Sequence, residues 1–497
     1  MNKYICKCGY EIESEKLTEN YSCPKCGASS NNFEKSEKLV DVIDSMLEEV
    51  IEKETQKIIN DDVEDKKVKI DPYNPAIVRI PEKCINCGQC KKTCENIVNL
   101  KYDIKKCKNP ICLGCGQCLL NCPTGAIIPR YCYHDVKRTI VSNDKIVVGI
   151  IAPAVRVALG EAFNLNPGDN VEKKIVTALK KLGFDYVFDT AFGADLTIME
   201  EVTEFAKRLK EGLALPQFTS CCPAWVKYAE IYHPELLENL STCKSPIGMQ
   251  CSIIKTYFAE EKNFESSKIV TVAIAPCTSK KMEAKEYTPN IDYVMTTSEL
   301  AIYLKEEEIN LSSLEENEYD SILGDSSGAG VIFGNTGGVT ESAIRTLYRM
   351  LTNENLKKED LTFNDLRGFK GIKEATVKIN KYVIKVAVVQ QMENLEAILK
   401  DDYYKKFHFI EVMNCKGGCI GGGGQPLCAI PKLEEVKQQR AEGLYKIDQK
   451  RANKFAHNNK ELKLLYKNYL KNPLGEKSMT LLHTTFSDKS SLLNEKK

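Results

Sequence analysis

The chain has no apolar segment long enough to suggest a membrane helix. Its longest apolar run, residues 147–154, is far short of the roughly 20 residues that a bilayer-spanning helix needs. The N-terminus, Met1 to Cys6, carries no apolar signal core. Net charge is also lacking, because 69 Lys and Arg residues balance 69 Asp and Glu residues, which leaves no basic field for nucleic acid. We therefore expect a cytoplasmic protein with neither a membrane nor a nucleic acid as partner.

Cysteine, in contrast, is abundant, with 22 among 497 residues. Disulfides are rare where thiols are kept reduced, so this number in an unsecreted chain indicates metal ligation. Fourteen of the cysteines precede residue 135, mostly in closely spaced groups. The chain is too long for one compact core, and we expect a multidomain α/β protein.

A small metal knuckle is predicted at residues 1–30. Two cysteine pairs, Cys6 with Cys8 and Cys23 with Cys26, are each followed by glycine, which is typical of a tetrahedral four-thiolate site. Zinc and a single rubredoxin-like iron both suit these ligands, but the one-residue gap in the first pair departs from the rubredoxin pattern and favours zinc. Residues 31–71 are predicted to form a charged helical linker, because their apolar residues follow a helical period.

Residues 72–135 contain a duplicated, ferredoxin-like cysteine pattern. Each copy has gaps of two, two and three residues between its four cysteines, which is highly specific for two 4Fe–4S clusters. A short loop can wrap three corners of a cube while the fourth thiolate comes from the other copy. We therefore assign Cys84, Cys87, Cys90 and Cys122 to one cluster, and Cys112, Cys115, Cys118 and Cys94 to the other.

Two details of this pattern depart from the simplest case. The first copy ends in Cys94-Glu95 rather than Cys-Pro. Cys107 and Cys132 are left over and are predicted to be structural, although Cys107 could replace a ligand.

Residues 136–430 alternate strand-like and helix-like segments and are predicted to form an α/β domain. The expected strands lie at residues 146–151, 186–189, 269–275, 382–389 and 408–413, and helices such as 171–182 and 196–210 lie between them. Residues 431–497 are predicted to be a largely helical C-terminal segment.

Three separate segments of the α/β domain carry cysteines. They are Thr219–Trp225 with Cys221 and Cys222, Ala275–Glu283 with Cys277, and Glu411–Ile420 with Cys415 and Cys419, followed by Gly421–Gly424. Two of them begin where a predicted strand ends, which is where α/β sheets collect binding sites. Thiolates are the ligands that iron–sulfur centres require, and glycines give the backbone room beside an inorganic cluster.

In this order, and behind the ferredoxin-like cysteines, the three segments resemble the signature segments of FeFe-hydrogenases. The resemblance extends from about residue 80 to residue 485 and implies the reaction 2 H+ + 2 e− ⇌ H2. It implies that electrons pass through the two 4Fe–4S clusters from a soluble ferredoxin or a similar carrier. It also implies an H-cluster, in which Cys222, Cys277, Cys415 and Cys419 hold a 4Fe–4S cube and Cys419 bridges it to a two-iron unit with CO and CN− ligands, built by maturation proteins.

The same resemblance assigns roles to residues around the two-iron unit. Lys280 is expected to hydrogen-bond a cyanide, and Cys221 to relay protons to the distal iron. The relay is expected to continue through Glu201, Ser241 and Glu204 toward the surface. Glu201, Glu204 and the neighbouring Arg208 are spaced to share one helix face. Residues expected to line the two-iron pocket are Met413 and Phe333.

Two pocket positions depart from the common pattern of the family. Ala275 stands where most members carry Met, and Ile247 stands where many carry Gln. With Ala224, they suggest the divergent subgroup called group B. These differences bear on rate, catalytic bias and oxygen sensitivity more than on cofactor identity.

Two other functions remain open from the sequence. One is an H2 sensor that signals to a partner, and the other is a non-catalytic relative that serves in electron transfer or cluster assembly. The presence of Cys221, Lys280 and the glycine-rich Cys415–Cys419 segment favours the enzyme. The five histidines are predicted to be structural, and so are the remaining cysteines, Cys243, Cys251 and Cys428.

Overall fold

The computed structural model describes residues 2–8, 10–36, 66–100 and 111–493, and it divides into two compact units between Asp65 and Lys66. Most of the predicted linker and Cys107 fall outside the described residues. None of the helices in the described part combines the length and apolar character that crossing a bilayer requires.

The N-terminal unit is a three-stranded antiparallel sheet of order β2-β1-β3. Its strands are β1 (Asn2–Cys6), β2 (Glu11–Ser14) and β3 (Phe33–Ser36). The sheet therefore extends past residue 30, and β3 lies where the helical linker was predicted to begin. The pairing of β3 with β1, from Cys6 opposite Phe33 to Lys3 opposite Ser36, accounts for this difference.

The larger unit begins with the ferredoxin-like segment. Strand β4 (Ile77–Arg79) pairs with β5 (Ile127–Pro129), and the two cysteine loops lead into α2 (Gln89–Asn96) and α3 (Gln117–Leu120). The small core of this segment includes Met282 from the α/β domain, so the two parts pack directly against each other.

Two mixed layers of strand and helix follow. The first sheet is parallel throughout, in the order β10-β9-β6-β7; the second has the order β11-β12-β13-β8 with only β11 antiparallel. The strands expected from the sequence lie within one residue of their predicted bounds: β6 (Ile146–Ile151), β7 (Tyr186–Asp189), β9 (Ile269–Ala275), β12 (Tyr382–Gln390) and β13 (Phe409–Met413). Strands that the sequence did not reveal are β8 (Gln217–Phe218), β10 (Tyr293–Thr296) and β11 (Ile372–Ile379).

Helix α6 (Thr190–Glu211) joins the two layers. Phe192 and Leu196 pack with the first sheet, whereas Ile198 and Phe205 pack with the second. A helix that is apolar around most of its circumference is expected to be buried, and α6 is buried between the two sheets. It starts six residues before the predicted helix because the carboxylate of Asp189 caps it by accepting from the Ala191 N–H.

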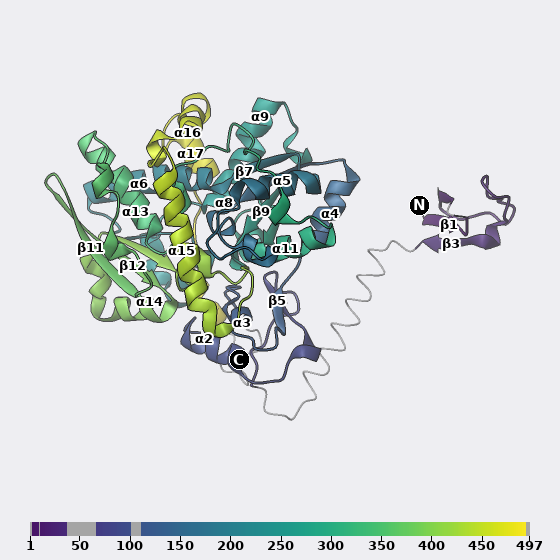
Figure 1. Cartoon of the computed structure of the whole chain (residues 1–497), viewed down its shortest axis with the longest axis horizontal. Coiled ribbons are helices and arrows are strands. Elements are labelled where there is room, and N and C mark those ends of the chain that lie inside the picture. Colours follow the sequence, from purple (N-terminus) through teal and green to yellow (C-terminus); the bar gives the residue numbers. More distant parts are fainter. Residues whose placement is uncertain (1, 9, 37–65, 101–110, 494–497) are drawn as a thin grey trace. The chain divides into compact units, whose positions relative to one another are not determined.

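Other helices cover the outer faces of the sheets. Figure 1 shows α4 (Tyr133–Ser142), α5 (Glu172–Leu182) and α11 (Thr297–Glu306) around the first sheet and α14 (Met392–Leu399) beside the second. The remaining helices of this part are α7 (Pro223–Tyr232), α8 (Pro246–Ile253), α9 (Ala259–Lys262), α10 (Ser279–Glu286), α12 (Gly328–Ile332) and α13 (Gly338–Thr352).

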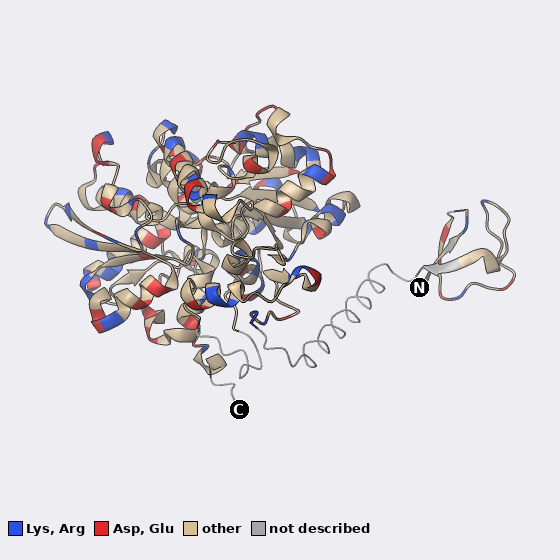
Figure 2. Ribbon diagram, turned by 60° about the horizontal axis from the view of Figure 1, so that its bottom comes forward, with Lys and Arg blue, Asp and Glu red and all other residues tan. Residues whose placement is uncertain are grey.

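The C-terminal segment is helical, as the sequence indicated. It contains α15 (Leu433–Lys450), α16 (Lys460–Leu465) and α17 (Glu476–Leu482). Helix α15 contacts α12 and the turns that follow β6 and β13, and Figure 1 shows it lying across the middle of the larger unit. Acidic and basic residues are interspersed along the ribbons of this unit (Figure 2).

Candidate metal centre

All three cysteine segments leave the carboxyl ends of strands. Cys221 and Cys222 follow β8, Cys277 follows β9, and Cys415 follows β13. The sequence revealed only the last two of these strand ends, because β8 is two residues long. Since β9 belongs to one sheet and β8 and β13 to the other, the parallel strands of both sheets direct their ends toward one place.

One cavity lies there, and the predicted pocket residues meet in it. Helix α6 contributes Thr190 and Ala194 to its wall. The predicted residues that line it are Cys221, Cys222, Cys277, Cys415, Cys419, Lys280, Met413, Phe333, Ala275 and Ile247.

The donor set of this cavity fits an iron–sulfur cluster. Burial raises the pKa of Cys277 to about 11 and that of Cys419 to about 12, so these thiols remain protonated unless a cation binds them. A cluster of iron ions supplies that charge and takes soft thiolate ligands. The buried amide of Asn414, which also lines the cavity, has no hydrogen-bond partner among the described residues. At Gly418, whose φ is +86°, a Cβ would lie 2.6 Å from the Thr336 nitrogen.

Lys280 projects into this cavity, but its charge already has a partner. Its ammonium group donates to the Cys221 carbonyl at 3.1 Å and to Glu283 at 2.5 Å. Burial lowers the pKa of Lys280, but Glu283 more than offsets this, so that the pKa lies above its ordinary value. Glu283 also accepts from the Ser245 hydroxyl, next to the helix that carries Ile247. Glu283 balances the charge of the buried Lys280 without any anionic ligand. The sequence had not indicated this role for Glu283.

Three residues of the expected proton relay, Glu201, Ser241 and Glu204, are buried. Ser241 donates to Glu204 at 2.8 Å, and Arg208 donates to Glu204 at 2.7 Å. Burial, followed by the charge of Glu204, raises the pKa of Glu201 to about 8. One carboxyl oxygen of Glu201 has no hydrogen-bond partner among the described residues. Burial also raises the pKa of Cys221, and the charge of Glu201 adds to this, so both groups hold their protons at neutral pH.

Glu204 also contacts a second group of hydrogen-bonded polar residues, which the sequence did not reveal. Thr242 donates its backbone N–H to Glu204, and its hydroxyl lies 2.7 Å from Nδ1 of His483. Nε2 of His483 lies 3.2 Å from Glu200, to which Tyr466 donates. His483 reaches this position because it pairs with Cys243 in an antiparallel bridge more than 200 residues away in sequence. Only the tertiary fold brings this histidine to the relay.

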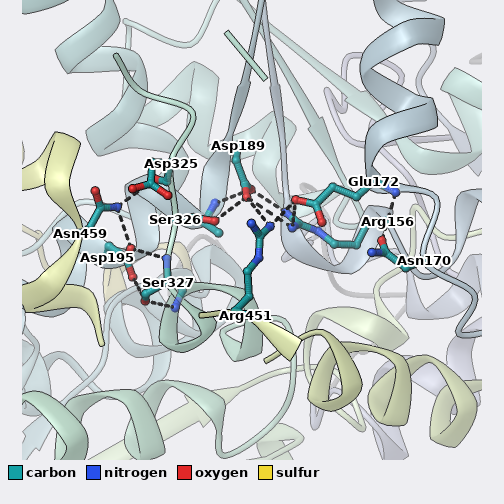
Figure 3. Close-up of polar contacts among 12 residues, drawn as sticks. Arg156, Asn170, Glu172, Asp189, Asp195, Asp325, Ser326, Ser327, Arg451 and Asn459 are labelled. Carbon is teal, nitrogen blue, oxygen red and sulfur yellow. Dashed lines mark hydrogen bonds and ion pairs between the residues drawn. The ribbon is translucent and has the colours of Figure 1, made fainter. Parts of the chain in front are cut away.

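Two buried clusters of polar and charged residues lie near the start of α6, and Figure 3 shows their contacts. In the first, Arg156 binds Asp189 and Glu172. Ser326 donates to Asp189, and Arg451 from the C-terminal segment binds Glu172. These contacts tie β7, the loop before α12 and the C-terminal segment together.

The second cluster centres on Asp195 of α6. It accepts from the backbone and hydroxyl of Ser327 and from the amide of Asn459. Burial raises the pKa of Asp195 to about 7, although these hydrogen bonds act in the opposite direction. Ser327 caps α12, and Phe333 follows the end of that helix, so the Asp195 cluster positions a residue that lines the cavity.

The ferredoxin-like cysteines also gather in two groups. Cys84, Cys87, Cys90 and Cys122 line one cavity. Burial raises the pKa of Cys94 and Cys118, and the thiols of Cys112 and Cys115 raise both further. Cys90 raises the pKa of both as well, so the two ligand sets assigned from the spacing, with the fourth cysteine of each set coming from the other copy, stay a prediction.

The N-terminal knuckle brings its four cysteines together. The sulfur atoms of Cys6, Cys8, Cys23 and Cys26 all lie within 4.8 Å of one another. Such spacing fits a single four-coordinate ion, and zinc and iron both accept four thiolates.

Most of the larger unit matches known families. Residues 145–423 match the family described as "Iron only hydrogenase large subunit, C-terminal domain", and residues 434–489 match "Iron hydrogenase small subunit". Iron hydrogenase 1 of Clostridium pasteurianum is 40% identical over 444 residues, which are 84% of this chain and 77% of that protein. The NADP-reducing hydrogenase subunit HndD of Solidesulfovibrio fructosivorans is 40% identical over 83% of this chain and 74% of its own length.

A second group of relatives carries a different name. Cytosolic iron-sulfur assembly component 3 of Bos taurus is 30% identical over 73% of this chain and 81% of its own length. Among solved structures, an apo [FeFe]-hydrogenase HydA1 variant from Chlamydomonas reinhardtii has a TM-score of 0.63 and 36% identity, covering 72% of this chain and 98% of its own. A HydA(deltaEFG) structure, titled for stepwise H-cluster assembly, has a TM-score of 0.64 and 37% identity over the same shares.

Proposed function

Because the chain belongs to the iron-only (FeFe) hydrogenase family, we propose that it is a catalytically active FeFe-hydrogenase, catalysing 2 H+ + 2 e− ⇌ H2. The observation that carries this proposal is the cavity in which Cys221 and Lys280 lie beside Cys222, Cys277, Cys415 and Cys419. A site that only stored or passed electrons would need the four ligands alone. Cys221 and the buried acids behind it give this site a path for protons as well.

In the proposed mechanism, Cys222, Cys277, Cys415 and Cys419 would hold the H-cluster. When bound, the H-cluster supplies the iron at which protons and electrons combine to H2. Lys280, kept charged by Glu283, offers its ammonium group to an anionic ligand at this place. Met413 and Phe333 exclude water from the cavity, as do Ala275 and Ile247.

Protons are proposed to move along the buried side chains behind Cys221. Arg208 and Glu204 form the outer end, because Arg208 is the more exposed member of the pair. Ser241 bridges toward Glu201, and Glu201 replaces the proton that the Cys221 thiol gives up. The raised pKa of Glu201, about 8, keeps a proton on that carboxyl at neutral pH.

Electrons are proposed to enter through the two 4Fe–4S clusters. Cys84, Cys87, Cys90 and Cys122 would hold the outer cluster, and Cys94, Cys112, Cys115 and Cys118 the cluster nearer the cube. A soluble ferredoxin or similar carrier as donor, separate maturation proteins and a cytoplasmic location belong to the same proposal. So does a zinc or iron ion in the Cys6–Cys26 knuckle.

The relatives named for iron-sulfur assembly favour one competing function. In that case the chain would hold iron–sulfur cubes without a two-iron unit. An H2 sensor is the other competitor, and it would bind the complete H-cluster but turn over slowly.

An infrared spectrum of the anaerobically purified, maturation-treated protein separates these functions. We expect sharp bands of metal-bound CO and CN−, together with H2 turnover on a reduced dye. A Cys419→Ser variant should lose the bands while keeping the two ferredoxin-type clusters. Absence of bands in protein supplied with the cofactor precursor would favour the assembly function, and bands without turnover would favour the sensor.

A further inference from the structure

The two ferredoxin-like repeats place a glutamine at the same position. Gln89 lies in Cys87-Gly88-Gln89-Cys90, and Gln117 lies in Cys115-Gly116-Gln117-Cys118. Their surroundings differ completely, since Gln89 is exposed whereas Gln117 is only 3% exposed. The same residue of the repeat is therefore exposed in one copy and buried in the other.

Gln117 reaches out of its own repeat to the cavity of the α/β domain. Its amide nitrogen donates to the sulfur of Cys415 at 3.1 Å and to the carbonyl of Gly421, also at 3.1 Å. A thiolate and a carbonyl are both acceptors, so the NH2 group and not the amide oxygen must face them. Both of its N–H bonds are thereby directed at the Cys415–Gly424 segment.

The surrounding loops hold this side chain in place. Thr278 donates to the Gly114 carbonyl at 2.6 Å, and Ser279 donates to the Leu113 carbonyl at 2.7 Å. Gly116, with φ of +68°, approaches Gly423 so closely that a Cβ would lie 3.0 Å from its Cα and 2.6 Å from the Thr278 hydroxyl. Backbone contact at this distance brings a side chain of one loop against a ligand of the other.

We propose that Gln117 is a positioning residue that sets the reduction potential of the cube held by Cys415 and couples it to the neighbouring 4Fe–4S cluster. This inference rests on the proposed function only in requiring the cube at Cys222, Cys277, Cys415 and Cys419. An N–H···S bond stabilises the more negative, reduced form of a cluster, so it raises the potential. With both clusters bound, the residues Cys115 and Cys118 would hold the electron donor and Cys415 the acceptor, and the transfer of one electron would exchange no proton and no bond.

The test is an infrared-monitored redox titration of the matured protein, because the CO and CN− bands of the two-iron unit respond to the charge on the attached cube. Gln117→Leu removes the donor and should lower the midpoint potential of the cube. The expected change is about tenfold in the ratio of oxidised to reduced cube at a given potential, equivalent to 59 mV for one electron. Gln89→Leu is the matched control and should leave this titration unchanged.

Gln117→Met is a second variant, in case the leucine variant misfolds, because methionine has a similar length but no hydrogen-bond donor. It should shift the midpoint potential in the same direction. An unchanged midpoint in either loaded variant would overturn the inference. So would failure of both variants to hold the cube, since Gln117 would then be a structural residue. If the parent protein shows no CO or CN− bands, the proposed function fails instead, and an EPR-monitored titration of the cube in the parent and Gln117→Met proteins decides the role of Gln117 separately.

Discussion

Single residues determine the chemistry of the cavity through their burial. Glu201, Ser241 and Lys280 are all more than nine-tenths buried, but they differ in how their burial is compensated. Lys280 has Glu283, and Ser241 has Glu204. Glu201 lacks a comparable partner for one of its oxygens, and its carboxyl group is therefore held in the protonated form.

Replacement of Cys221 tests the step nearest the metal. Cys221→Ala should retain the CO and CN− bands, because Cys222 and not Cys221 is the proposed ligand. H2 turnover should fall at least about 100-fold, since a positioned proton donor contributes that much or more. Cys251→Ala, at a buried cysteine of α8 away from the cavity, is the control. Turnover at the parent rate in Cys221→Ala would exclude the relay.

Glu201→Gln should stabilise the fold in a pH-dependent way. The folded-state pKa of about 8 exceeds the ordinary value of 4.5, so the folded protein binds the proton more tightly than the unfolded chain. Stability contributed by this proton is complete below pH 4.5 and decreases as the pH rises to about 8. The variant lacks this loss, and its advantage over the parent should grow across that window and level off above it.

Thermal unfolding of the two proteins from pH 5 to pH 9 measures this difference. Glu261→Gln, at an exposed position, should show no such trend. An advantage that stayed constant with pH would mean that Glu201 is already ionised in the folded protein.

At the scale of elements, α6 is the part on which the site depends. It packs on both sheets, lines the cavity with Ala194, and carries Glu201, Glu204 and Arg208 along one face. Its start is held by Asp189 and the Arg156 cluster. Loss of a residue from that cluster should therefore destabilise the whole of α6.

Arg156→Met should destabilise the larger unit by roughly 3–5 kcal/mol, because it leaves Asp189 and Glu172 buried with less compensation. The midpoint of thermal unfolding at pH 7 measures this loss. Lys173→Met, which removes an exposed ion pair with Glu318, should cost no more than about 1 kcal/mol. Equal effects of the two substitutions would show that the buried cluster contributes little.

At the scale of the whole molecule, the chain consists of two units, each with its own clustered cysteines that could hold a metal. A unit of this small size has little apolar core, so its fold should depend on its metal ion. Cys23→Ser should therefore lose one zinc or iron ion per chain and the structure of the N-terminal unit. Metal analysis should register that loss while the CO and CN− bands of the matured protein remain at the parent positions. Altered bands would mean that the two units are coupled.

Several parts of the fold could be predicted because their signals are local. The strands β6, β7, β9, β12 and β13 are short segments rich in apolar, β-branched and aromatic residues, which is a signal that the local sequence carries by itself. Strand β8 has two residues and β3 lies in a segment of helical periodicity, so neither carries such a signal. The strands with which β8 and β3 pair decide their structure. The partner of β8 is β13, which is distant in sequence.

The amino-acid sequence by itself predicted the proposed ligand sets, because cysteine spacing within a short loop limits which thiolates can surround one cluster. It also determined the family resemblance, through motifs that each span a few residues. Only the tertiary structure decided which polar side chains serve those ligands. Gln89 and Gln117 stand in the same local motif, yet only Gln117 reaches Cys415. His483 joins Glu204 through Thr242 for the same reason, since burial and hydrogen bonding depend on neighbours that the fold brings from distant parts of the chain.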